Sequence, residues 1–199
     1  MLEQCSLEDD PELQEKWASL LANAASQDRC HIVYPPFGSI LSKLTSLQVL
    51  FLDKLHELTA LKMVGYLTSK GQPFSMAPFA LHELSEKELA ILYFQAVNFI
   101  ASKTPTPDGP ATTRAVEDWE FQVDLLEHHF GLLRSARFDL PGRDALKVTG
   151  YKNSALPFSG AKKGRRPLTL ADAQSVKFPY YFLSQTGYRF VEACKLPKR

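Results

Sequence analysis

The chain has 199 residues, 45% of them hydrophobic, and its 23 Lys and Arg nearly balance its 22 Asp and Glu. This composition supports one ordinary domain or two small ones that share a core, and it excludes a disordered chain or a collagen-like fibre. Its apolar stretches fall short of the roughly 20 residues that span a bilayer, and the acidic start lacks the order of a signal peptide. We therefore expect a cytoplasmic globular protein that makes no membrane contact.

The charge is unevenly distributed along the chain. Residues 1–130 hold 9 Lys and Arg against 18 Asp and Glu, whereas residues 131–199 hold 14 against 4. This asymmetry indicates either an anionic partner for the C-terminal part or a mutual attraction of the two halves. Both interpretations stay open at this point.

The first predicted helix begins near residue 10. Asp9 or Asp10 can cap it, and Pro11 suits its first turn. The apolar residues that recur at helical spacing predict one buried stripe: Leu13, Trp17, Leu20, Leu21 and Ala24. Residues 30–34 are expected to be a short extended segment that two prolines close.

Three further helices are predicted before residue 104. A short one covers Ile40 to Leu44, and the next is capped by Thr45 or Ser46. The inward residues of this long helix are expected to be Leu47, Leu50, Phe51, Leu55 and Leu58. Leu61, Val64 and Leu67 are expected to continue the helix as far as the break at Gly71 and Pro73. A capping box with serine at position 85 and glutamate at position 88 opens a very apolar third helix.

The residue pattern of the C-terminal half predicts a helix, two strands and a last helix. After a linker rich in Pro and Gly at 103–113, a narrow apolar seam indicates a helix that ends at Gly131. Strands are predicted at 132–138 and 178–184, and a helix at about 185–195. We therefore expect a mainly α fold: a helical subdomain at 1–104, and a winged-helix-like subdomain at 113–199 with a small two-stranded hairpin.

Several segments together resemble one family. Residues 10–24 read DPELQEKWASLLANA and resemble the hallmark motif of the Abi-alpha family, which is named for abortive-infection defence against phage. Residues 37–47 fit the motif that follows it, although Pro36-Phe37-Gly38 departs from the usual form. Residues 125–133 and 183–194 resemble later segments of the family. Family members usually carry a further segment before the hallmark, so this chain is expected to be a shortened or partial copy.

The resemblance implies a largely helical fold and a context of phage defence, but it brings no catalytic residues. The residues themselves predict no catalytic, metal or cofactor site. His128 and the next histidine point about 100° apart on a helix, and Asp124 is the expected surface partner of His128. Cys30 adjoins His31 only in sequence, and Cys194 is expected in the core.

Four cations are the one candidate binding site. Lys162, Lys163, Arg165 and Arg166 lie in a long connection, residues 139–177, and they could contact nucleic-acid phosphates or simply keep a loop solvated. The helix before the first strand is acidic, with one arginine among five carboxylates, so we do not expect it to enter a DNA groove.

The function that these patterns favour is a non-enzymatic interaction or sensing component of phage defence in bacteria, with a protein partner or self-association. The alternative is a DNA- or RNA-binding regulator that uses the basic arm, residues 162–166. A hydrolase or nuclease is the least favoured interpretation, because the sequence shows no carboxylate cluster with metal-binding spacing.

Overall fold

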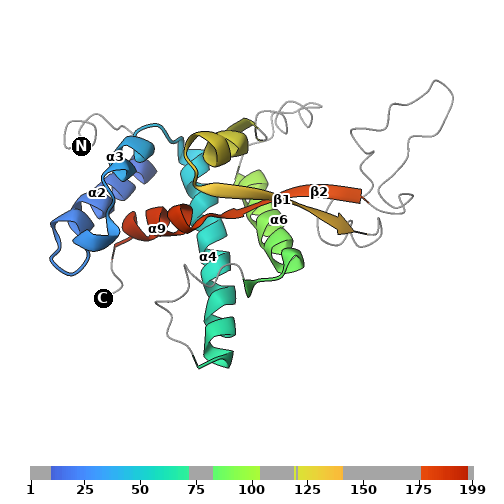
Figure 1. Cartoon of the computed structure of the whole chain (residues 1–199). Helices are drawn as coiled ribbons and strands as arrows, with labels where there is room; N and C mark the ends of the chain where they lie inside the picture. The colour runs from blue at the N-terminus through green and yellow to red at the C-terminus, as the bar shows by residue number, and fades with distance from the viewer. Residues whose placement is uncertain (1–9, 72–82, 104–118, 120, 141–175, 197–199) are drawn as a thin grey trace, which may run out of the picture.

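The computed structural model describes residues 10–71, 83–103, 119, 121–140 and 176–196 (Figure 1). The described part is mostly helical, with one small antiparallel sheet. Its main helices are α2 (Pro11–Ala25), α3 (Pro36–Leu41), α4 (Ser46–Ser69), α6 (Glu86–Lys103) and α9 (Gln185–Ala193). The sheet pairs β1 (Leu133–Leu140) with β2 (Val176–Leu183). The mainly α fold predicted from the sequence is confirmed.

Helix α4 lies at the centre of the arrangement. In Figure 1, α2, α3 and α9 lie on one side of it, while α6 and the sheet lie on the other. The chain returns from β2 through α9 toward α2, so the end of the chain packs against its beginning. One hydrophobic cluster joins these elements, and its largest fully buried side chains are Trp17, Tyr180, Tyr188, Phe37 and Phe51.

Local capping signals set the helix starts. The Asp10 carboxylate accepts hydrogen bonds from the backbone N–H groups of Glu12 (2.9 Å) and Leu13 (3.3 Å). Ser85 and Glu88 form the predicted capping box, in which each side chain accepts from the other residue's backbone N–H. Thr45 caps α4 in the same way, together with Gln48. These predicted starts are confirmed.

The buried face of α2 differs from the prediction. Trp17 and Leu20 are fully buried as expected, but Leu21 is half-buried and Ala24 is exposed. Asn23 is buried instead, because its side-chain amide donates to two carbonyls at the end of α9. The segment predicted to be extended at 30–34 contains a 3-10 turn at Cys30–Ile32.

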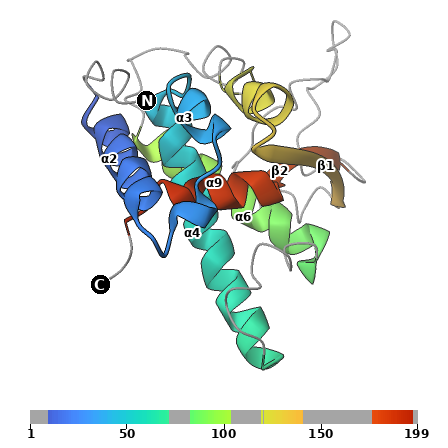
Figure 2. The same cartoon turned by 60° about the vertical axis from the view of Figure 1, so that its left-hand side comes forward.

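Helix α4 continues through Leu61, Val64 and Leu67 as predicted, but its end is buried on one side only. Leu67 and Met63 are buried, but Leu61 is 66% exposed and Val64 is 47% exposed. The C-terminal turns of α4 extend past the other described helices in both views (Figures 1 and 2). On another side of this part of α4, Lys62 pairs with Glu88 in the first turn of α6 at 3.0 Å. Gly71, with φ +65°, follows the helix where the sequence predicts a break.

The hairpin and α9 form close to the predicted positions. Leu133 pairs with Leu183, and Leu140 with Val176. The helix before β1 ends in a π turn at Leu125–His129, and Gly131 follows it with φ +64°. The described residues thus contain the expected order of helix, strand, strand and helix, but the winged-helix assignment and the subdomain bounds 1–104 and 113–199 stay predictions. Across the described residues, we find no helix that is long and apolar enough to cross a membrane.

Candidate functional site

A cluster of charged side chains lies where α4 meets α9. His56 of α4 is buried, and its Nε2 lies 2.7 Å from Oε1 of Glu192 on α9. Its other nitrogen, Nδ1, lies 2.8 Å from Nζ of Lys195, just past the end of α9. Burial lowers the pKa of His56, and the contact with His56 lowers the pKa of Glu192. Three titratable groups thus share one contact between helices.

Helix α2 and the turn after it hold the backbone of the same segment. The Asn23 amide donates to the carbonyls of Ala193 (2.8 Å) and Lys195 (2.9 Å). A guanidinium N–H of Arg29 donates to the Glu192 carbonyl at 3.3 Å. The last carbonyls of a helix lack partners within the helix, and the Asn23 amide satisfies those of Ala193 and Lys195. Arg29 adds a second donor to the Glu192 carbonyl, which already accepts from the Lys195 N–H.

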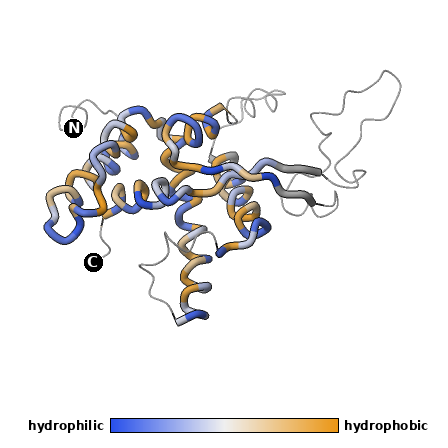
Figure 3. The backbone as a smooth tube through the Cα atoms, viewed as in Figure 1, coloured by the Kyte–Doolittle hydropathy of each residue, from blue (hydrophilic) through white to orange (hydrophobic). Residues whose placement is uncertain are grey.

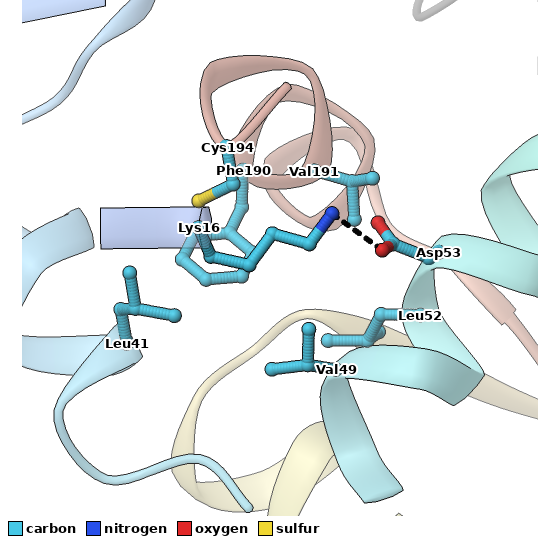
Figure 4. Close-up of a pocket in the computed structure, with 8 residues that line it drawn as sticks. All are labelled: Lys16, Leu41, Val49, Leu52, Asp53, Phe190, Val191 and Cys194. Carbon is cyan, nitrogen blue, oxygen red and sulfur yellow. Dashed lines mark ion pairs between the residues drawn. The ribbon is translucent and has the colours of Figure 1, made fainter. Parts of the chain in front are cut away.

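An ion pair lies beside this cluster. Lys16 Nζ of α2 contacts Asp53 Oδ2 of α4 at 2.6 Å, with both side chains largely covered (Figure 4). The cavity between them has a volume of about 10 Å³, and its apolar lining includes Leu52 and Val191. This is room for about one water molecule. On the other side of Asp53, an open hollow of about 260 Å³ is lined by Lys54, Glu57, Phe99 and Lys195 among others.

The predicted partner of His128 is confirmed. His128 Nε2 lies 3.3 Å from Asp124 Oδ1 and 3.6 Å from Glu127 Oε2. The other oxygen of Glu127 accepts from the N–H (2.7 Å) and hydroxyl (2.6 Å) of Ser135. These three side chains are the described group that could hold a metal ion, although His128 and Asp124 are exposed. The contacts are also those of an ordinary ion pair between positions i and i+4.

The remaining predicted positions divide into two sets. The basic arm, Lys162, Lys163, Arg165 and Arg166, lies outside the described residues. Both described cysteines are free thiols: Cys30 is exposed, and Cys194 is buried, where burial raises its pKa to about 12. A thiol with that pKa is protonated at neutral pH and therefore a poor nucleophile.

An exposed apolar surface lies on the projecting end of α4. We call it the α4 face and define it by the exposed Leu61, Val64, Gly65 and Thr68 and the half-buried Ala60. They share one side of the helix, because each of them has another member three or four positions away. Figure 3 shows much of this end of α4 as hydrophobic. A Cβ added to Gly65 would meet no atom within 4 Å, so its backbone is open to close approach.

The sequence did not reveal the cluster at His56. Its partners Glu192 and Lys195 lie more than 130 positions away, and no local spacing connects them. The one available signal is that the last helix carries Glu192 beside the inward residues Val191 and Cys194. That signal places the carboxylate near the core but does not name its partner.

Comparison with known proteins gives one match. Residues 1–101 match the family model described as abortive infection alpha. The matched range contains α2, α3, α4 and most of α6, and therefore includes His56 and the α4 face. The resembling segments at 125–133 and 183–194 lie outside it. No curated protein and no solved structure matches the chain. On a match that covers half of its length, the chain belongs to the abortive infection alpha (Abi-alpha) family.

Proposed function

We propose that this protein is a non-enzymatic interaction or sensing component of abortive-infection defence against phage in the bacterial cytoplasm, and that it contacts a protein through the α4 face. Family membership supports the defence context. The observation that carries the contact is the exposure of Leu61 (66%) and Val64 (47%) on one side of a projecting helix.

The arrangement of the α4 face suits a protein partner. Single exposed apolar side chains are common on protein surfaces. Leu61 and Val64, however, lie one turn apart, and Gly65 next to them has no side chain to hold a partner helix away. An apolar helix or groove could bury both side chains, at roughly 25 cal/mol per Å² of apolar surface removed from water. A second copy of the chain is the first partner to test.

The described histidines at the two charged clusters have partners within the fold. His56 is held between Glu192 and Lys195, and His128 contacts Asp124. These contacts support a structural role for both side chains. Nucleic-acid binding through the basic arm at 162–166 stays a prediction from the sequence, with a test of its own in the Discussion.

The experiment compares two double variants in cells challenged with phage. Leu61→Glu/Val64→Glu places two charges on the α4 face. Gln95→Glu/Asn98→Glu is the matched control, because it places the same two charges three positions apart on an exposed side of α6. Substitutions at exposed positions usually change stability by less than about 0.5 kcal/mol, so both proteins should melt like the wild type.

We expect the α4 variant to lose protection against phage and the α6 variant to keep it. Size-exclusion chromatography with light scattering then shows whether the lost contact is self-association. Full protection by a folded α4 variant would overturn the proposed contact.

A further inference from the structure

Lys195, His56 and Glu192 form a continuous chain of side chains across the contact between α4 and α9. Lys195 Nζ lies 2.8 Å from Nδ1 of the ring, and Nε2 lies 2.7 Å from Glu192 Oε1. An ammonium group only donates, so Nδ1 must accept and the ring proton must lie on Nε2. Burial lowers the pKa of Lys195 as well as that of His56, and the ordinary pKa of lysine lies about four units above that of histidine, so the proton belongs to Lys195. A neutral His56 therefore bridges a cation and an anion.

Further charged or titratable groups lie near His56 on α2, α4 and α9. From α9, the Tyr188 ring lies with its centroid 4.5 Å from that of His56. On α4 itself, Asp53 is paired with Lys16 of α2, and Glu57 is exposed. Arg29, after α2, contacts the Glu192 backbone. Burial lowers the pKa of His56, the Glu192 carboxylate raises it, and the Lys195 charge lowers it further, with a net decrease.

We propose that His56, Glu192 and Lys195 are a proton-sensitive latch that fixes the C-terminal end of α9 to α4. Protonation of the ring puts an N–H on Nδ1, where it faces the Lys195 ammonium. Two donors at this distance cannot share a hydrogen bond, so the Lys195 side chain leaves while Glu192 stays with the imidazolium. The Asn23 amide does not titrate, so acid leaves its hydrogen bonds to the carbonyls of Ala193 and Lys195 in place. Acid therefore releases the side-chain part of the contact and leaves the backbone part in place.

The direction of the pH dependence follows from linkage. Because the folded-state pKa of His56 is lower than 6.5, the unfolded chain binds more protons as the pH falls. The stabilisation is fully present above pH 6.5 and is lost as the pH falls through the folded-state pKa. Glu192, with a lowered pKa, adds a further loss below about pH 4.5. Each unit of decrease in the His56 pKa corresponds to about a tenfold change in the folding equilibrium.

The first test is an NMR titration of His56 in the full chain. We expect a neutral ring protonated on Nε2 at pH 7.5, and a pKa below 6.5. Lys195→Met should raise the His56 pKa, and Glu192→Gln should lower it, because the two charges act in opposite directions. A His56 pKa that stays the same in both variants, or a ring protonated on Nδ1, would overturn the latch.

The second test follows amide hydrogen exchange at the end of α9. The Lys195 N–H donates to the Glu192 carbonyl, so its protection reports on the latch. After correction for the intrinsic exchange rate, we expect wild-type protection to be lower at pH 5.5 than at pH 7.5. His56→Gln, which keeps a donor for Glu192 but cannot titrate, should remove this difference. Asn23→Ala should lower protection equally at both values.

Lys195→Met is a second variant for the exchange experiment. If His56→Gln does not fold, Lys195→Met provides the same comparison, because the histidine can then be protonated without facing a cation. An unchanged pH dependence in a folded His56→Gln or Lys195→Met protein contradicts the proposal.

Discussion

Substituting Gly187 by alanine tests the close packing at the start of α9. A Cβ at this position would lie 2.0 Å from the Leu132 carbonyl oxygen and 2.8 Å from its carbon. Both atoms belong to the backbone, so no side-chain rotation can relieve the overlap. The two segments must separate by about 1 Å before the oxygen contact reaches 3.0 Å.

The expected cost of Gly187→Ala combines overlap with lost hydrogen bonds. Overpacking a buried position costs about 1–3 kcal/mol. The displacement also strains the two Ser184 hydrogen bonds across this contact, in which its N–H donates to the Leu132 carbonyl and its hydroxyl donates to the Gly131 carbonyl, each worth about 1 kcal/mol. The higher helix propensity of alanine offsets about 0.5–1 kcal/mol of this loss in folding free energy. We expect a net destabilisation of about 2–4 kcal/mol.

Gly65→Ala is the matched control for this prediction. Gly65 lies in α4, and a Cβ there would meet no atom within 4 Å. It should therefore stabilise the protein by about 0.5–1 kcal/mol through helix propensity alone. Urea unfolding followed by circular dichroism measures both changes. If Gly187→Ala is as stable as the wild type, the packing of α9 on Leu132 is wrong.

Three other single substitutions and one quadruple variant have defined outcomes. Trp17→Ala should cost about 3–5 kcal/mol in urea unfolding, because the indole is fully buried, and an unchanged unfolding midpoint would refute the inner face of α2. His128→Ala and Cys30→Ser should leave phage protection near the wild-type level, and loss of protection by folded His128→Ala would instead support an enzyme. The wild-type chain should bind nucleic acid no better than non-specifically, in the range of about 10⁻⁴ to 10⁻⁶ M. Submicromolar binding near physiological salt that is lost when the four cations at 162, 163, 165 and 166 are replaced by alanine, measured by anisotropy at two salt concentrations, would favour the nucleic-acid alternative.

Local chemistry made much of the fold predictable. The carboxylate of Asp10, the ring of Pro11 and the capping box of Ser85 and Glu88 act within one helical turn, so their residues reveal the helix starts without tertiary information. The strands at 133–140 and 176–183 were also found within a few positions of their bounds.

Contacts between distant parts of the chain were not predictable in the same way. From the sequence, Asn23 is expected to be an exposed polar residue. It is buried because its amide donates to the carbonyls of Ala193 and Lys195, which are distant in the sequence. Leu61 and Val64 continue the apolar pattern of α4, but periodicity does not say whether another element covers them. For the same reason His56 looked isolated, although it is buried and its two ring nitrogens contact Glu192 and Lys195.

The most direct test of the proposed function is affinity capture from phage-infected cells, with and without nuclease. The bait is the wild-type chain, with Leu61→Glu/Val64→Glu and Gln95→Glu/Asn98→Glu as comparisons. We predict that a protein is captured both with and without nuclease. The Gln95→Glu/Asn98→Glu variant should still capture it, and the Leu61→Glu/Val64→Glu variant should not. Capture that nuclease abolishes, or that the α4 variant retains in full, would contradict a protein contact through the α4 face.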